Sequence, residues 1–489
     1  MQVEQEKNPY DLSDAELQSL YNSGPEQTIG FIKLILDRLR KVEEEVTYLK
    51  SIISKDSHNS SKPPSTDGYK KKTKIKNLRK KSKKKSGGQK GHPGVTLRLS
   101  DNPDETEHLP IKNCSCCGES KHLIVIGKKR RQVIELEIKK IIKEFQGDIA
   151  ECTGCGAITT ATFPAYVNQD VQYSPLVKAI IIYMRNLNFI PTERLTEMFA
   201  DVFHIPLSEG TIYNTIKKCS NILKPFDDYV KAKLLESPIV HFDETGMRIE
   251  QSLHWLHSAS NELYTFYFPH KRRGKIAMNA MDILPHFNGT AIHDSLPSYF
   301  AYTCKHGLCN GHHLRELIFV NEELGQRWAK KMLDLLIEVK GKVDKAKAKG
   351  KTINKKLMLY YEKRYKRIIY EGKRENPVVP LIACDQKKRG RKKKGKVLCL
   401  LDRLKTKFLQ VFAFMYDILI PFDNNQAERD IRMGKLYQKI SGCFRTMDGA
   451  ICFFRIRSYI STLRKHKINV IISLKNIFEK GQFSELTTE

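Results

Sequence analysis

Between residues 29 and 53 the apolar side chains recur with the spacing of a heptad repeat. Two series, each stepping by seven residues, occupy the a and d positions, and Arg, Lys and Glu lie between them. The pattern predicts a helix that ends near Ser54 and packs its apolar seam against a second copy, as a coiled coil. The alternative is an amphipathic helix packed on its own chain. The two series are Ile32, Leu39, Val46 and Ile53, and Ile35, Val42 and Leu49.

The second half of the chain begins with patterns typical of strands. The run 238–249 places β-branched and aromatic residues before a turn signal, and 253–258, 263–268 and 290–293 have the same character. Residues 273–284 are predicted to form a helix. Three strands, a helix and a fourth strand indicate an α/β domain.

Two of these strands end in a carboxylate, at Asp243 and Asp294. A buried carboxylate is costly unless it is paired or holds a metal ion. Side chains alternate across a strand, so Asp243 and its neighbour Glu244 point to opposite faces. A third acid, Glu428, falls in the first turns of a helix predicted from the Asp and Asn residues of 421–432.

These three acids suit one oxygen-rich site for Mg²⁺ or Mn²⁺. Two such ions, about 4 Å apart, would activate an attacking oxygen and stabilise a leaving oxygen at phosphorus. Each acid also has a structural explanation. An Asp after a strand is a common turn residue, and a Glu near a helix start is favoured by the helix dipole.

The overall charge indicates a polyanionic partner. The chain of 489 residues carries a formal net charge of +30, and nucleic acid is the expected partner. The N-terminus does not resemble a signal peptide, and no apolar run is long enough to span a membrane. Twelve cysteines without a secretory signal favour thiols and metal over disulfides.

The positive charge is concentrated in two segments. After a linker at 57–68, residues 70–90 hold eleven lysines and Arg79 without an acid, and a second basic run occupies 387–396. Both are interpreted as non-specific phosphate contacts on DNA, and a solvated tail or loop is the alternative. The side chains proposed to contact DNA are Lys70, Lys71, Lys72, Lys80, Lys81, Lys83, Lys84 and Lys85, with Arg389 and Arg391 in the second run.

Four cysteines form two C-x-x-C pairs, each followed by glycine. Cys114 with Cys117 and Cys152 with Cys155 have the spacing of a tetrahedral, structural zinc site. The alternating segment 131–138 between them is predicted to contribute strands of a zinc ribbon. Free thiols or a redox pair are the alternatives.

Residues 173–235 are predicted to be helical. Two short helices, at 191–203 and 208–218, flank a tight turn as in a helix-turn-helix. A helical hairpin that only supports the next domain fits equally well. In the first case the side chains available to DNA are Thr211, Tyr213, Asn214 and Lys217.

Four further residues lie close in sequence to the acids. Cys309 and His312 form a C-x-x-H pair that can bind metal, although His312 contacting a DNA phosphate or positioning an acid is favoured. Arg429 and Arg432 flank Glu428. Arg432 shares its helix face, so it can hold a phosphate or neutralise the acid.

The motifs resemble a known family. H-F-D-E-T-G at 241–246, H-D-S-L-P-S-Y from 293, C-N-G-H-H-L-R-E-L from 309 and P-F-D-N-N-Q-A-E-R-D-I-R at 421–432 are similar to the IS66-type DDE transposases of bacterial insertion sequences. The resemblance implies catalytic roles for Asp243, Asp294 and Glu428, and an RNase H-like catalytic domain. It also implies DNA strand cleavage followed by joining of the freed 3′-OH to a target.

The resemblance and the patterns together give one expected organisation. A coiled coil (1–55), a basic linker (56–100), a zinc ribbon (101–165) and a helix-turn-helix-like domain (166–236) precede a catalytic domain (237–480) with a helical insertion at about 314–417. The expected partners are double-stranded DNA, further copies of the chain and accessory proteins of the element, in the bacterial cytoplasm near the nucleoid. A metal-dependent endonuclease and a DNA-binding regulator derived from a transposase are the alternative functions.

Overall fold

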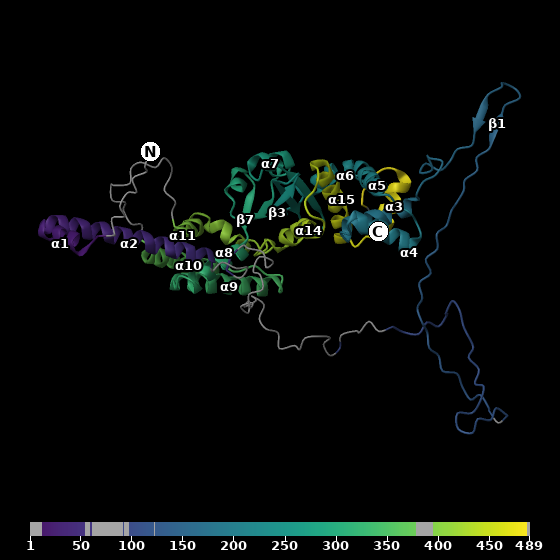
Figure 1. The fold of residues 1–489 in the computed structure, drawn as a ribbon, viewed down its shortest axis with the longest axis horizontal. Coiled ribbons are helices and arrows are strands. Elements are labelled where there is room, and N and C mark those ends of the chain that lie inside the picture. Colours follow the sequence, from purple (N-terminus) through teal and green to yellow (C-terminus); the bar gives the residue numbers. More distant parts are fainter. Residues whose placement is uncertain are drawn as a thin grey trace. The chain divides into compact units, whose positions relative to one another are not determined.

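The computed structural model describes residues 12–53, 59–60, 91, 97–121, 123–377 and 395–486 (Figure 1). The proposed DNA-contacting lysines at 70–85, together with Arg389 and Arg391, lie outside these residues. The chain divides into two compact units. One comprises Met1–Lys71, Pro164–Thr192 and Gly210–Glu489, and the other comprises Lys72–Phe163 and Glu193–Glu209.

The N-terminal heptad forms a helix, as predicted. A short helix α1 (Asp14–Asn22), whose first turn is closed by a capping box between Ser13 and Glu16, precedes the long helix α2 (Pro25–Ile53). The a and d side chains of α2 from Ile32 to Leu49 are all exposed. The apolar seam is therefore open along the described helix, and the coiled coil stays a prediction.

The smaller unit, which contains both C-x-x-C pairs, has little regular structure. Its two strands, β1 (Ile149–Glu151) and β2 (Ile158–Thr160), pair antiparallel around the second C-x-x-C pair. The strands predicted at 131–138 were wrong, because these residues form no strand. Their apolar side chains have no surface to pack on, and Val133 and Leu136 are more than 80% exposed. Helix α4 (Thr192–Phe203) follows later in the chain.

A five-stranded mixed sheet forms the centre of the larger unit (Figure 1). The strands β3 (Ile239–Ile249), β4 (Ser252–Ser260) and β5 (Thr265–His270) form an antiparallel meander. On its other side β3 pairs in parallel with β6 (Thr290–His293), and β6 with β7 (Lys305–Leu308). The sheet order is β5-β4-β3-β6-β7. The four predicted strands are confirmed, and β7 is a fifth that the pattern did not reveal.

The predicted helix after β5 is shorter than expected. Helix α7 (Lys275–Met281) ends at Asp282, which adopts a left-handed conformation, and a 3₁₀ turn η3 (Leu284–His286) follows. A second 3₁₀ turn, η4 (Pro297–Ala301), lies between β6 and β7.

Helices from both ends of the unit share one hydrophobic core with the sheet. They are α3 (Pro175–Ile182) with its π-helical extension η2 (Tyr183–Leu187), α5 (Glu209–Ile222), α6 (Lys224–Leu235), α15 (Met447–Lys465) and α16 (Val470–Lys480). Phe226 of α6, Phe242 of β3 and Ile460 of α15 are buried in the same cluster. The helices predicted at 191–203 and 208–218 correspond to α4 and α5, and their helix-turn-helix role stays a prediction.

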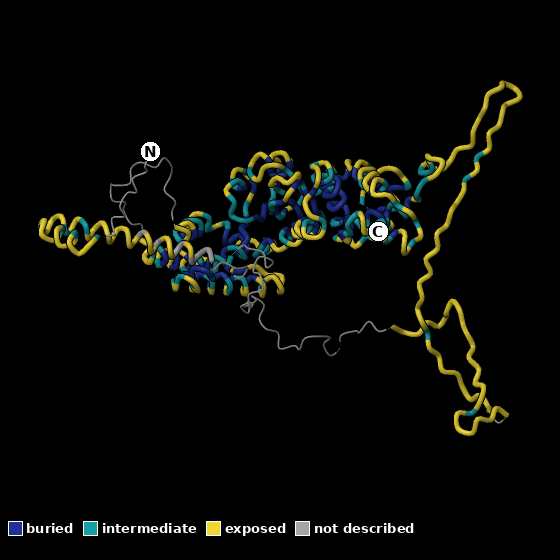
Figure 2. Tube along the Cα trace, in the orientation of Figure 1, coloured by how far each residue is buried: buried dark blue, intermediate teal, exposed yellow. Residues whose placement is uncertain are grey.

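A helical insertion separates β7 from the third acid. It contains α8 (Asn310–Glu322), α9 (Arg327–Lys347), α10 (Lys355–Glu375), α11 (Lys396–Thr406) and the short helices α12 (Phe408–Val411) and α13 (Ala413–Tyr416). These helices enclose a second core around Trp328, Leu335 and Tyr365. Figure 2 shows buried positions both in the sheet with its helices and in this insertion. In the described residues, none of the helices has the length and apolarity needed to cross a membrane.

Candidate active site

The strand register brings the first two acids to the same level of the sheet. In the parallel pair of β3 and β6, Ile239 is opposite Thr290 and His241 is opposite Ile292. Continuing this register by two residues places Asp243 opposite Asp294, which directly follows β6. Asp294 directly follows the carboxyl end of β6, as predicted. The strand end predicted at Asp243 was wrong, because the pairing with β4 continues β3 past this acid to Ile249. The two carboxylates lie at the same level, where the parallel pairing of β3 with β6 ends.

The third acid is brought to this edge by one buried asparagine. Helix α14 (Asn425–Ser441) carries Glu428 in its first turn, and Asn424 precedes it. The predicted side-chain N-cap is absent at Asn424. Instead, His241 Nδ1 donates to Asn424 Oδ1 at 2.7 Å, and Asn424 Nδ2 donates to the Phe242 carbonyl at 2.8 Å. Asn424 thus attaches the start of α14 to the strand segment immediately before Asp243.

The rest of α14 follows the sheet closely. Gly434 permits the approach, because a Cβ there would lie 2.9 Å from Leu256 Cδ2 of β4. Further along, Gln438 Nε2 donates to the Arg248 carbonyl of β3 at 3.3 Å. A buried ion pair of 2.9 Å between Asp430 of α14 and Lys465 of α15 fixes the other side of the helix.

Burial and neighbouring carboxylates raise the pKa of two of the acids, Asp243 and Asp294. Burial, followed by the charge of Glu244 and then those of Asp294 and Glu428, raises the pKa of Asp243 well above its usual value. Burial and the charge of Glu244 also raise the pKa of Asp294 to about 6. Buried carboxylates that repel one another are typical of sites that take up a cation or a proton.

A fourth acid, Glu244, is buried and has protein partners at both of its oxygens. Arg273 donates to Glu244 Oε1 from Nε at 3.0 Å and from Nη2 at 2.8 Å, and the Tyr299 hydroxyl donates to Oε2 at 2.6 Å. The Glu244 side chain is 1% exposed. With both oxygens bound by protein groups, Glu244 supports the site and adds to its negative potential. The alternation along β3 indicated that Asp243 and Glu244 differ, but it gave no sign of Arg273 or Tyr299.

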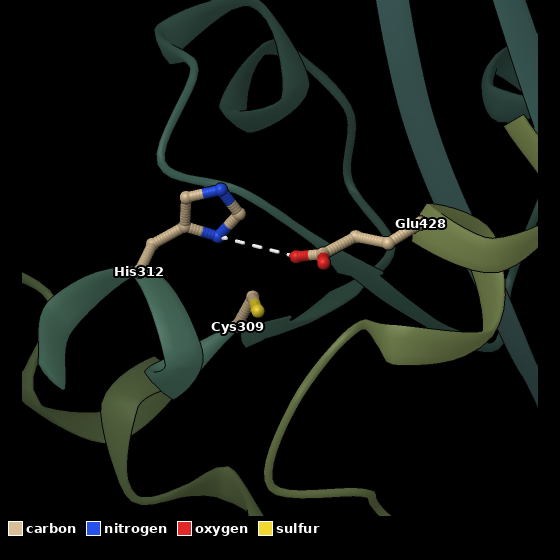
Figure 3. Close-up of side chains that lie close together, drawn as sticks. All are labelled: Cys309, His312 and Glu428. Atoms are coloured by element: carbon tan, nitrogen blue, oxygen red, sulfur yellow. Dashed lines mark ion pairs between the residues drawn. The ribbon is translucent and has the colours of Figure 1, made fainter. Parts of the chain in front are cut away.

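A compact group of a thiol, an imidazole and a carboxylate surrounds the third acid (Figure 3). Cys309 directly precedes α8 and His312 lies in its first turn, so the C-x-x-H spacing turns both side chains toward Glu428. His312 Nδ1 is 4.0 Å from Glu428 Oε1. Burial and the charge of Arg315 lower the pKa of His312 to about 4, and burial and the charge of Glu428 raise the pKa of Cys309 to about 12.

Three arginines lie close to the acids. Arg315 Nη2 is 3.4 Å from Glu428 Oε1, and Arg432 Nη2 is 3.8 Å from Glu428 Oε2. Arg403 of the insertion interacts with Asp294 and also lowers the pKa of His312 and His313. The sequence indicated Arg432 through its helical spacing. Arg315 and Arg403 were missed because only the packing of α8 and α11 brings them to the site.

Each C-x-x-C pair forms a local knuckle. The backbone N–H groups of Cys117 and Cys116 lower the pKa of Cys114, and those of Gly154 and Cys155 contribute to lowering the pKa of Cys152. Gly118 and Gly156, which follow the pairs, both have positive φ. The two knuckles are not gathered into one four-sulfur group. Among the described residues, a single group of three or more such side chains can share a metal ion, and it is Cys309, His312 and Glu428.

Helix α5 presents the side chains predicted for DNA contact. Tyr213, Asn214 and Lys217 are exposed on one face and Thr211 is half-buried, whereas the opposite face enters the core through Ile212 and Cys219. Arg429 and Arg432 are exposed on α14.

A family model described as the IS66 family transposase matches residues 170–451. The match includes the sheet, the insertion and all three acids, and it covers more than half of the chain. The chain belongs to the IS66 transposase family. A second family model, of unknown function, matches residues 11–98 of this family member, which include α1 and α2. No curated protein matches the chain.

Membership of the IS66 family indicates the general activity of the protein. A transposase family implies DNA binding and a nuclease or transferase activity. The mixed α/β fold with its central sheet fits a transposase catalytic domain.

Proposed function

We propose that the chain is a DDE transposase whose catalytic acids are Asp243, Asp294 and Glu428. It would bind transposon ends, cleave a DNA strand and join the freed 3′-OH to target DNA. The observation that carries the proposal is the parallel register that sets Asp243 opposite Asp294, with Asn424 attaching the helix of Glu428 to the same strand. The strand order agrees with an RNase H-like catalytic domain, which we also propose.

The three acids fit divalent cations with oxygen ligands, such as Mg²⁺ or Mn²⁺. Asp243 interacts with both of the other acids, which is the arrangement needed for one carboxylate to serve two ions. The raised pKa values of Asp243 and Asp294 indicate uncompensated negative charge that cations would relieve. When bound, the ions would activate the attacking oxygen and stabilise the leaving oxygen at phosphorus.

The chain's own cations would hold the DNA. On α14, Arg432, Lys435 and Lys439 are exposed at successive three- and four-residue steps from Glu428 and form a basic stripe. On α5, Lys217 and Lys218 are exposed, and burial followed by the nearby charge of Lys218 lowers the pKa of Lys178 in α3. Phosphate contacts of this kind give affinity with little sequence preference. The basic segments at 70–90 and 387–396 are proposed to add to them.

Three further assignments belong to the proposal. The exposed heptad of α2 supports assembly through a coiled coil, which a complex of two transposon ends requires. The C-x-x-C spacing and the N–H groups that favour thiolates at Cys114 and Cys152 support one structural zinc ion, which would draw together the two knuckles that lie apart in the metal-free chain. The helix-turn-helix role of α4 and α5, and the involvement of accessory proteins, are proposed on the sequence pattern and the family resemblance.

The test is strand cleavage and joining by the purified protein. Labelled DNA carrying the element's end is incubated with Mg²⁺ and a plasmid target, and Asp243→Asn is compared with wild type. The matched control is Asp282→Asn, because Asp282 is exposed in a left-handed conformation that Asn also tolerates.

We expect cleaved and joined products with wild type and Asp282→Asn, and neither product with Asp243→Asn. Cleavage without joining in wild type would favour the endonuclease. Binding without metal-dependent cleavage would favour the regulator and would contradict the three-acid site.

A further inference from the structure

We propose that Cys309, His312 and Glu428 form a second metal site, selective for thiophilic divalent cations such as Zn²⁺, whose occupancy inhibits the enzyme. Metal binding at this group is independent of the proposed function. The inhibition rests on it, because Glu428 is also the third acid of the proposed Mg²⁺ site.

The geometry provides three convergent ligands. One ligand atom from each of the three side chains lies within 4.8 Å of the other two, without an ion present. Figure 3 shows the Nδ1 side of the His312 ring facing the Glu428 carboxylate, with Cys309 beside them. A sulfur, a nitrogen and an oxygen ligand with a fourth position open is a donor set for Zn²⁺ or Co²⁺, whereas Mg²⁺ prefers oxygen ligands alone.

The His312 imidazole has a buried nitrogen without a hydrogen-bond partner among the described residues, and a cation could bind to it. His312 Nδ1 is buried and makes no hydrogen bond within the described residues. At 4.0 Å its contact with Glu428 Oε1 is too long for a hydrogen bond. If Nδ1 carries no proton, its lone pair faces a carboxylate, which is repulsive. A cation between Nδ1 and the carboxylate satisfies both groups.

The sulfur is held by the same asparagine that positions the third acid. The Asn424 backbone N–H donates to Cys309 Sγ at 3.2 Å, and such N–H groups stabilise a metal-bound thiolate. Cys309 is 2% exposed, so its position is fixed by packing. Coordination would release one proton from Sγ to solvent as the metal–sulfur bond forms.

The consequence is competition for Glu428. An ion held beside Cys309 and His312 would draw electron density from the Glu428 carboxylate and orient it toward those ligands, which would weaken its binding of a hard cation shared with Asp243. A thiophilic ion should therefore lower the Mg²⁺-dependent rate, and removing the sulfur should relieve this inhibition.

The binding test uses the full-length protein and Co²⁺, whose bond to a thiolate absorbs light. The protein is first loaded with one equivalent of Zn²⁺ and then titrated with Co²⁺. We expect wild type to give a thiolate band at one further equivalent, and Cys309→Ser to lose it. His312→Gln should keep the band but bind Co²⁺ at least about tenfold more weakly. Tenfold is the lower limit because the loss of a group that only supports a metal ligand already weakens metal binding by about that factor.

The control is Cys304→Ser, because Cys304 is also buried but lies before β7, at the opposite end of the strand from Cys309. Any cobalt at the knuckle cysteines contributes equally to all variants, so the difference between variants reports the new site. An unchanged band in Cys309→Ser would overturn the site.

The inhibition test compares, within each variant, the cleavage rate with Mg²⁺ alone and with Mg²⁺ plus Zn²⁺. We expect this ratio to be large in wild type and in Cys304→Ser, and near one in Cys309→Ser. Equal ratios in all three would overturn the inhibitory role. If wild type binds Co²⁺ through the thiolate but cleaves no DNA, the metal site stands and the proposed function fails.

Discussion

Replacing Asp294 by asparagine should stabilise the metal-free protein while abolishing cleavage. Asparagine keeps the local hydrogen bond, since its Oδ1 can still accept the Leu296 N–H that Asp294 Oδ1 accepts at 2.8 Å. The substitution removes only the charge, which is disfavoured in the folded state by burial and by the charge of Glu244. A carboxylate proposed to be catalytic would in this way reduce the stability of the metal-free protein, as functional groups commonly do.

The size of the effect follows from the pKa of Asp294. Folding raises it from a usual value of 3.8 to about 6. A difference of about two in pKa corresponds to about 3 kcal/mol of folding free energy. Because the folded pKa is the higher one, the contribution of Asp294 to the stability of wild type is greatest below pH 3.8 and falls as the pH rises through 6. The variant should be about 3 kcal/mol more stable at neutral pH, and the gap should narrow toward pH 4.

The assay is thermal unfolding followed by circular dichroism in the presence of a chelator. The variant should have a Tm a few degrees above wild type at neutral pH, since about 1 kcal/mol corresponds to ~1–2 °C in a unit as large as the one that contains Asp294. Mg²⁺ at about 100 times its Kd should stabilise wild type by about 2.7 kcal/mol and leave the variant nearly unchanged.

The matched control is Asp417→Asn, because Asp417 accepts the Leu419 N–H at 2.9 Å in the same local geometry but is exposed. Its Tm should not change. A Tm of Asp294→Asn equal to or below that of wild type at neutral pH would refute the electrostatic reasoning.

Three further variants test the residues that support the site and the assembly of the chain. Asn424→Ala should lose about 1–3 kcal/mol of stability, because a buried donor and a buried acceptor lose their partner, and cleavage should fall about 10²-fold through misplacement of Glu428. Lys465→Met should cost about 3–5 kcal/mol in urea unfolding, because it leaves Asp430 uncompensated where both side chains are 12% exposed. Ile35→Lys with Val42→Lys should shift the protein to monomer in sedimentation equilibrium with little loss of helix, because both side chains are exposed in the single chain.

Each of these has a matched control on the same element or of the same type. Asn425→Ala alters the exposed residue that follows Asn424, and Leu34→Lys places a charge on α2 outside the a and d positions. Lys233→Met breaks an exposed ion pair with Glu236 and should cost at most about 1 kcal/mol. Cleavage by Asn424→Ala at the wild-type rate would contradict the positioning role of Asn424. A loss of unfolding free energy in Lys465→Met no larger than in Lys233→Met would contradict the argument for the Asp430–Lys465 ion pair. Monomers formed by Leu34→Lys alone would contradict the coiled coil.

The sequence determined those features that depend on local periodicity. The heptad predicted a helix through residues 29–53, and α2 spans Pro25–Ile53. Strand patterning correctly placed Asp294 after a strand, whereas β3 runs past Asp243 because its pairing with β4 continues to Ile249. The apolar pattern of 131–138 was misleading, because alternation yields a strand only where one face can be buried, and here the side chains are exposed.

Tertiary structure alone decided how the third acid reaches the first two. More than a hundred residues separate Asp294 from Glu428, and no periodic pattern carries information across them. Asn424 had the sequence signature of a helix cap, yet its amide bonds to β3, because the packing of α14 on the sheet offers it buried partners there. Arg273 and Arg403 likewise approach the acids only through the fold. The sequence therefore predicted which acids form the proposed site. Long-range packing determined which residues position these acids and shift their pKa values.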